Sequence, residues 1–326
     1  MDIQHNWAGR TPLNAWGVLC VLLLVWSAGS GCSVRRYALN QVADALAHSG
    51  STYASDDDPE LVKAAVPFSL KLLEALLAEN PTHKGLLTAA ASGFTQYAYA
   101  FVEQEADELE ARDLAAAEAM RKRARRLYLR AKQYGLSGLE ANHPGLKQAL
   151  QTNPKAAVRV FTKAEVPMIY WTAAAWASAI TLSKDNPDLI AQIPAMEALI
   201  DRALELDESY GAGAIHSFMI TYEMARKGAT GDPTVRARQH FERALAIAGE
   251  NSAGPMVTLA EAVTIQKQNV KEFEALLNRA LVVNPDAHPD TRLLNLVMQR
   301  RARWLLSRKA DLFLIENEEK PAGGKP

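Results

Sequence analysis

Cys32 is the residue whose setting in the sequence predicts the most specific chemistry. Residues 15–28 form an apolar run of the length of a signal-peptide core, shorter than the roughly 20 residues of a membrane-spanning helix. Gly29, Ser30 and Gly31 then lead directly into Cys32. This arrangement resembles a bacterial lipobox, in which small residues fit the signal peptidase and the cysteine thiolate accepts a diacylglycerol group. The sequence therefore predicts a signal peptide over residues 1–31 and lipid attachment at Cys32.

The predicted lipid anchor places the chain in the cell envelope. Each buried acyl methylene contributes about 0.8 kcal/mol, so two or three chains hold a protein firmly at a bilayer. Ser33, at the second position of the mature chain, favours the outer membrane in a bacterium with two membranes. Gly29 departs from the pattern, because a branched apolar residue is usual three positions before the cysteine. An uncleaved anchor, or an ordinary signal followed by an unrelated cysteine, remains the alternative.

Two aromatic segments are the candidates for a binding site. Tyrosine and tryptophan have one polar end that needs a partner, and the small residues beside them leave space, which suits a ligand channel or a subunit contact. Ordinary core packing is the alternative, and it is the commoner role of such stripes. The predicted lining consists of Phe94, Tyr97, Phe101, Tyr170, Trp171 and Trp176, together with His216, a histidine in an apolar context.

Nothing in the sequence selects a catalytic, metal or cofactor site. The zinc-protease, phosphate-loop and nucleophile-elbow motifs are absent, and both cysteines lie before residue 33. His216 is more typical of a satisfied core or cavity-lining histidine than of a metal ligand. A carboxylate pair of a cell-wall hydrolase would be possible, but no pair is singled out. The formal net charge of -1 argues against nucleic-acid binding. We therefore predict that the protein is not an enzyme and needs no cofactor.

Charged segments in the body of the chain have simple structural explanations. Asp58, Pro59 and Glu60 have the order expected of a helix start, with Asp58 as N-cap, which is preferred here to cation binding by neighbouring aspartates. The acidic stretch 103–110 and the basic stretch 121–126 read as oppositely charged, solvated helix faces. A contact with a partner or a lipid headgroup is the alternative for the basic stretch.

The elements that carry these residues are predicted to be helices throughout. Apolar residues recur three and four positions apart, alternation with a period of two is almost absent, and Pro- or Gly-containing breaks separate the helices. We expect one all-α domain over residues 32–315 and a disordered tail over 316–326. Arg-Ala-Leu triplets at Arg202, Arg243 and Arg279 suggest stacked helical hairpins with degenerate tetratricopeptide-like repeats. The alternative is chance similarity among alanine-rich helix pairs.

Several motifs together resemble one family. They are D-D-D-P-E-L-V at 56–62, P-F-S-L-K-L-L-E-A-L-L-A-E-N-P at 67–81, F-T-Q-Y-A-Y-A-F-V at 94–102, Y-W-T-A-A-A-W at 170–176 and D-E-S-Y-G-A-G-A-I-H at 207–216. Behind a lipobox-like start, they are similar to the T-component (TatT) family of tripartite ATP-independent periplasmic (TRAP) transporters.

This resemblance implies a periplasm-facing lipoprotein of helical hairpins that forms a trimer with a pore through each subunit. It also implies that the partner is the periplasmic solute-binding protein and that the ligand is hydrophobic or an organic acid. A general envelope assembly scaffold without a small-molecule channel is the second interpretation.

Overall fold

The structure is a computed structural model, and it describes residues 41, 45, 50–249 and 251–314. The chain divides into two units after Ala45, and the fold described below is that of the second. Cys32, the predicted signal peptide and the predicted tail lie outside the described residues, so those predictions stay predictions. None of the described helices is long and apolar enough to cross a membrane.

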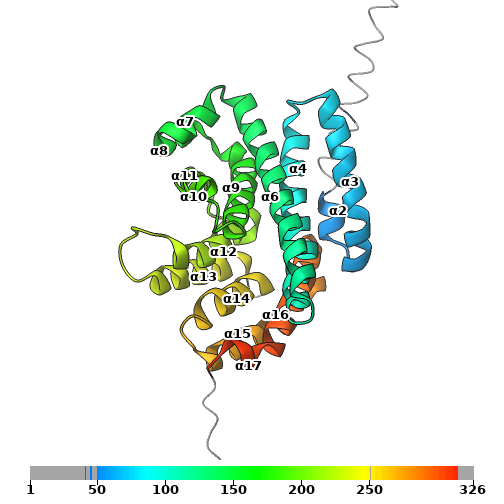
Figure 1. Cartoon of the computed structure of the whole chain (residues 1–326), viewed down its shortest axis with the longest axis vertical. Helices are drawn as coiled ribbons and strands as arrows, with labels where there is room; N and C mark the ends of the chain where they lie inside the picture. Colours follow the sequence, from blue (N-terminus) through cyan, green and yellow to red (C-terminus); the bar gives the residue numbers. More distant parts are fainter. Residues whose placement is uncertain (1–40, 42–44, 46–49, 250, 315–326) are drawn as a thin grey trace, which may run out of the picture. The chain divides into compact units, whose positions relative to one another are not determined.

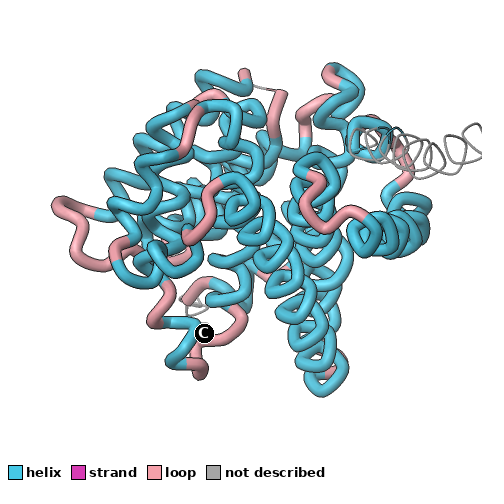
Figure 2. Tube along the Cα trace, turned by 90° about the horizontal axis from the view of Figure 1, so that it is seen from above, coloured by secondary structure: helices cyan, strands magenta, loops and turns pink. Residues whose placement is uncertain are grey.

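Helices account for the fold, and the described residues contain no strand (Figure 2). The prediction of an all-α protein is therefore confirmed. The α-helices are α2 (Gly50–Ala54), α3 (Pro59–Glu79), α4 (Lys84–Ala98), α5 (Gln104–Glu110), α6 (Leu114–Asn142), α7 (Leu146–Thr152), α8 (Pro154–Ala157), α9 (Val166–Thr181), α10 (Pro187–Ile190), α11 (Ile193–Leu206), α12 (Tyr210–Ala225), α13 (Pro233–Ala248), α14 (Ala253–Leu259), α15 (Val270–Leu281), α16 (Arg292–Ser307) and α17 (Lys309–Leu312). Two π-helical turns, η1 (Tyr99–Glu103) and η4 (Ala260–Thr264), continue α4 and α14. Short 3₁₀ turns are η2 (Val158–Val160), η3 (Lys163–Glu165), η5 (Pro285–Ala287) and η6 (Pro289–Thr291).

Helix starts follow the capping residues that the sequence supplies. The Asp58 carboxylate accepts hydrogen bonds from the backbone N–H groups of Glu60 and Leu61, both at 3.0 Å, and Pro59 is the first helical residue. The same order of a side-chain cap followed by proline opens α8, α10 and α13. These contacts satisfy backbone donors that a helix leaves free at its first turn. The prediction of a helix cap at Asp58 is confirmed.

Successive helices pack as neighbouring pairs, which Figure 1 shows as α4 with α6, α9 with α11, α12 with α13, and α14 with α15. The three Arg-Ala-Leu triplets lie on α11, α13 and α15, the second helix of its pair in each case. Their alanines, Ala203, Ala244 and Ala280, are fully buried. A small residue there lets two helices approach closely. The hairpin pairing is thus observed, whereas the likeness to tetratricopeptide repeats stays a prediction.

The last long helix, α16, packs against the first ones, α2 and α3 (Figure 1). Arg300 binds the Glu108 carboxylate at 2.6 Å, and Arg301 binds Asp107 at 2.8 Å. Arg292 donates to the backbone oxygen of Ser55 at 2.8 Å. The stack of helical pairs is therefore closed by contacts between its two ends, which local sequence patterns did not predict.

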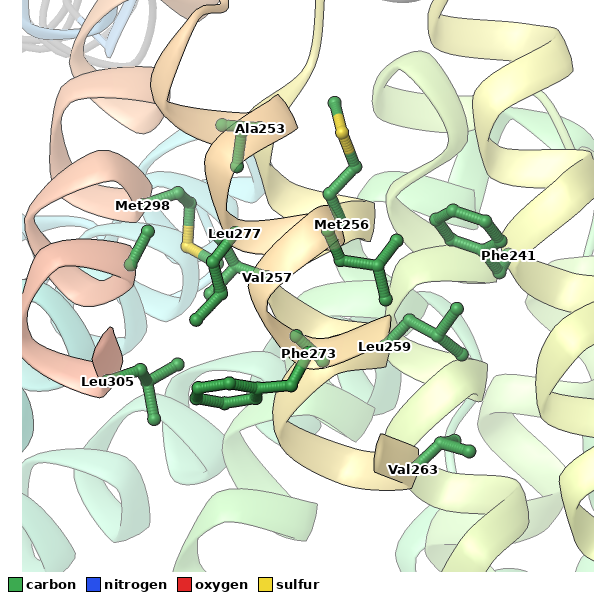
Figure 3. Packing of buried hydrophobic residues seen from close by; sticks show 14 of the residues in the cluster. Phe241, Ala253, Met256, Val257, Leu259, Val263, Phe273, Leu277, Met298 and Leu305 are labelled. Atoms are coloured by element: carbon green, nitrogen blue, oxygen red, sulfur yellow. The ribbon is translucent and has the colours of Figure 1, made fainter. Parts of the chain in front are cut away.

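A large hydrophobic cluster lies among the C-terminal helices (Figure 3). Phe273 of α15 is its largest fully buried aromatic residue, and its ring meets that of Phe313 edge to face with centroids 4.9 Å apart. Figure 3 shows it in the same cluster as Leu277 and Leu305. Close packing of this kind fixes the position of α16 and therefore the closing contacts.

Candidate functional site

The residues predicted to line a channel lie in the helix packing. Trp171 is partly exposed. The other six are buried, namely Phe94, Tyr97, Phe101, Tyr170, Trp176 and His216. Two of the surface cavities in the described part of the chain are large enough to consider. One of about 590 Å³ lies beside α8, α11 and α12, and one of about 300 Å³ lies beside α3, α5 and α16. None of the seven residues lines either cavity. Their role in a channel stays a prediction.

Apart from His216 on α12, the predicted residues occupy two separate helix segments. On α4, Phe94 stacks on Tyr134 of α6 with centroids 5.9 Å apart, and Tyr97 contacts Phe101 of η1 at 5.8 Å. On α9, Tyr170 contacts the neighbouring Trp171 at 4.9 Å and Tyr210 of α12 at 5.4 Å. The structure therefore brings each aromatic segment together internally, and α6 lies against both.

His216 has protein partners on both sides of its ring. Its Nδ1 lies 2.8 Å from Nδ1 of His240, and its Nε2 lies 3.2 Å from the Glu208 carboxylate. Burial lowers the pKa of His216, so the neutral ring is favoured. No group of three histidine, cysteine, aspartate or glutamate residues in the described ranges is arranged to hold a metal ion. His216 is thus a satisfied core histidine.

The prediction of oppositely charged helix faces is correct for the ion pairs between the basic and the acidic stretch. Arg121 of the basic stretch binds Asp107 and Glu110 of the acidic stretch, both at 2.7 Å, so opposite faces do meet. The prediction of a solvated acidic face is wrong at Glu103. Its carboxylate lies beside the fully buried Tyr128, and burial raises its pKa. The helix turns Glu103 inward because it follows Tyr99 by one turn on the same face.

A half-buried cation beside Trp176 forms the candidate site. The Lys132 ammonium of α6 lies 4.3 Å from the centroid of the Trp176 ring on α9. Gln192, which precedes α11, accepts one hydrogen bond from Lys132 at 2.7 Å and another from the Trp176 indole N–H at 3.0 Å. Both bonds end on the same amide oxygen, Oε1. Three helical segments thus converge on one ammonium group.

Close packing of α6 against α9 positions this cation. A side chain at Gly135 would place its Cβ 2.0 Å from Oγ1 of Thr172, and one at Gly138 would place it 2.3 Å from Sδ of Met168. Going back three residues along α6, from Gly138 to Gly135, corresponds to going forward four residues along α9, from Met168 to Thr172. One more such step leads to Lys132 on α6 and to Trp176 on α9. The glycines therefore set the helix separation that places the ammonium over the ring.

No negative charge compensates Lys132 in the part of the chain that the structure describes. No carboxylate lies within ion-pair distance of it, and desolvation alone lowers the pKa of Lys132 to about 8. The ammonium is therefore still mostly charged at pH 7. The Trp176 ring, which is 5% exposed, and the Gln192 amide offer it only partial negative charge. A bound anion would restore the favourable interactions that burial removes.

Sequence reasoning found Trp176 and missed Lys132 and Gln192. Lys132 follows the basic stretch 121–126, and nothing in its own neighbours marks it as partly buried. The signal that was present is the pair Gly135 and Gly138, three residues apart on a long helix. Such spacing marks a face on which another helix comes close, and it would have directed attention to the charge one turn earlier.

The fold and the site define an all-helical protein whose candidate site is suited to binding a ligand. Residues 55–313 match the family described as TRAP transporter T-component. Because this match covers most of the chain, the protein belongs to the TRAP transporter T-component family. Membership implies a role in a TRAP transport system and an association with the cell envelope. A protein of Treponema pallidum (strain Nichols), described as uncharacterized, is 29% identical over 303 residues, which cover 87% of this chain and 94% of that protein.

Proposed function

We propose that this protein is the periplasm-facing lipoprotein of a TRAP transport system, that it binds the periplasmic solute-binding component, and that it receives a carboxylate-bearing ligand at Lys132. The proposal of a carboxylate ligand is supported by the Lys132 ammonium, which lies over the face of Trp176 and has no carboxylate partner among the described residues. A carboxylate would pair with the ammonium, and the apolar part of the ligand would contact the aromatic ring. Burial of apolar area contributes about 25 cal/mol per Å² to such binding.

Replacing Lys132 by methionine is expected to weaken binding of benzoate at least tenfold. A hydrogen bond to a charged group contributes about 1.5–3 kcal/mol, and 1.4 kcal/mol corresponds to a factor of ten in affinity. Isothermal titration calorimetry of the full chain in detergent micelles measures the change. Lys155→Met, which removes the same charge from an exposed position of α8, is the control and should bind benzoate like the wild type. Equal affinities in all three proteins would rule out the site.

The pH dependence of benzoate affinity gives a second test of the same site. The affinity should be constant below about pH 8 and fall above it, because the ammonium loses its proton there. Bound carboxylate stabilises the ammonium and raises the pKa of Lys132, so binding near pH 8 should take up protons. Titrations in two buffers with different ionisation enthalpies measure that uptake. Proton release, or an affinity that rises above pH 8, would contradict the proposal.

Replacing Cys32 by serine is expected to release the protein from the membrane into the periplasm. Serine lacks the thiolate that accepts the diacylglycerol, so the acyl chains that hold the protein at the bilayer are lost. Fractionation of cells with an antibody against the chain measures the distribution. Cys20→Ser, a change within the apolar run, is the control and should remain in the membrane fraction. Retention of both variants would favour the uncleaved anchor.

Purification of the anchored protein from envelope extracts separates the TRAP function from the alternative of a general assembly scaffold. We expect a TRAP solute-binding protein and a bound small acid to co-purify. Recovery of envelope assembly proteins without either would contradict the proposed function. The predicted channel lining would be tested in the same preparation with Tyr97→Ala and Trp171→Ala, which should reduce the amount of bound ligand.

A further inference from the structure

The solvent-facing side of α3 is apolar over most of its length. Between Glu60 and Glu79, the exposed positions of this helix recur three and four residues apart, so they form one stripe. Leu61 in this stripe is 58% exposed and Phe68 is 74% exposed. The outer stripe of α3 consists of Leu61, Ala64, Phe68, Lys71, Ala75 and Ala78, of which only Lys71 carries a charge.

The other charged residues inside α3 are turned toward neighbouring helices. Lys63 binds the Glu105 carboxylate of α5 at 2.6 Å, and Glu74 accepts a hydrogen bond from the Tyr134 hydroxyl of α6 at 2.7 Å. The opposite side of α3 is packed into the fold through four buried apolar residues, Val62, Leu70, Leu73 and Leu77. A helix that is apolar on both sides is normally covered on both sides, so the outer stripe needs a partner.

The area of the outer stripe argues against a second copy of the chain as this partner. α3 has 21 residues and lies at the edge of the helical stack (Figure 1). A rise of about 1.5 Å per residue and a width of about 10 Å give the stripe an area of roughly 300 Å². A stable protein interface buries about 800 Å² on each partner. The stripe is therefore too small to hold a dimer together, although it can support a contact with a surface that is already nearby.

We propose that the outer stripe of α3 lies on the surface of a lipid bilayer, with Leu61 and Phe68 inserted among the lipids. α3 is the first long helix that the structure describes after Cys32, and residues 33–58 join the two. The lipid predicted at Cys32 therefore keeps the bilayer at a high effective concentration beside α3. The Lys71 side chain is 70% exposed, so its ammonium can reach the lipid phosphates. This inference rests on the lipid anchor of the proposed function and not on the ligand at Lys132.

Spin labels on the anchored protein in vesicles of phosphatidylethanolamine and phosphatidylglycerol test the proposal. Leu61→Cys and Phe68→Cys each supply one thiol for the label, because Cys32 is the only cysteine of the predicted mature chain and its lipid blocks it. The control is Val235→Cys, at a 51% exposed position of α13 on the other side of the helical stack from α3 (Figure 1). The ratio of collisions with oxygen to collisions with a water-soluble nickel chelate should be several-fold higher at positions 61 and 68 than at 235.

Equal collision ratios at all three positions of the anchored protein would overturn the proposal, because the stripe would then face water. Spectra of Phe68→Cys that are broad and become sharp on dilution with unlabelled protein would also overturn it, because a second copy would then cover the stripe. A label found on Cys32 by mass spectrometry would overturn the anchor and this inference together. The two failures can thus be told apart, and neither affects the benzoate titrations.

Discussion

Replacing Phe273 by alanine is expected to lower the free energy of unfolding by about 3–5 kcal/mol, the usual range for removing a fully buried phenylalanine. Phe273 is 0% exposed, and its ring meets that of Phe313 within the C-terminal hydrophobic cluster. Its loss would leave a cavity that α15 and α16 can fill only partly. Urea unfolding followed by circular dichroism measures the change.

Phe68→Ala provides the control for this effect, because it is the same substitution at an exposed position. Phe68 is 74% exposed on α3, so its removal should change the free energy of unfolding by less than about 0.5 kcal/mol. Equal losses in the two variants would contradict the arrangement of the core. A much smaller loss for Phe273→Ala would mean that the helices around it collapse into the space.

Replacing Gly135 by alanine is the second change with a large expected effect. The new Cβ would lie 2.0 Å from Oγ1 of Thr172 and 2.9 Å from its Cβ, so α6 and α9 must separate or shift. We expect a loss of about 1–3 kcal/mol from overpacking, even though alanine favours helix over glycine by about 1 kcal/mol. Because Lys132 lies one turn away, the affinity for benzoate should fall as well. Urea unfolding and calorimetry measure the two effects.

Gly93→Ala is the matched control on α4. A Cβ there would meet only the terminal Cδ2 of Leu70, at 2.9 Å, and a flexible side chain can move aside. The gain in helix propensity should largely offset that adjustment, and benzoate binding should be unchanged. If Gly135→Ala behaved in the same way, the close approach of α6 to α9 would not be what positions the cation.

At Lys132 a cation is held without a carboxylate partner in the described residues, and the amide of Gln192 lies beside it. An isolated buried charge lowers the stability of a fold unless a ligand neutralises it. The position of Lys132 is therefore better explained by binding than by stability.

The class of fold and the local ends of its elements could be predicted from the amino-acid sequence. Periodicity over three and four residues identified the helices, and the order Asp58-Pro59 identified where α3 begins. The alanines of the Arg-Ala-Leu triplets marked where helices pack closely. These features can be recognised in the sequence because each depends on residues that lie within one or two helical turns of each other. The family resemblance rested on whole segments and was likewise available from sequence.

Contacts between residues far apart in the chain became visible only in the folded structure. Lys132 and Gln192 are separated by 60 positions, and Asp107 and Arg301 by 194, so their contacts depend on how helices cross and where the stack closes. The π-helical turns and the buried carboxylate of Glu103 were equally hidden. A charged residue has the same local pattern whether its helix face meets water or another helix. Burial is set by packing between elements, and it is burial that turns an ordinary lysine into a candidate binding group.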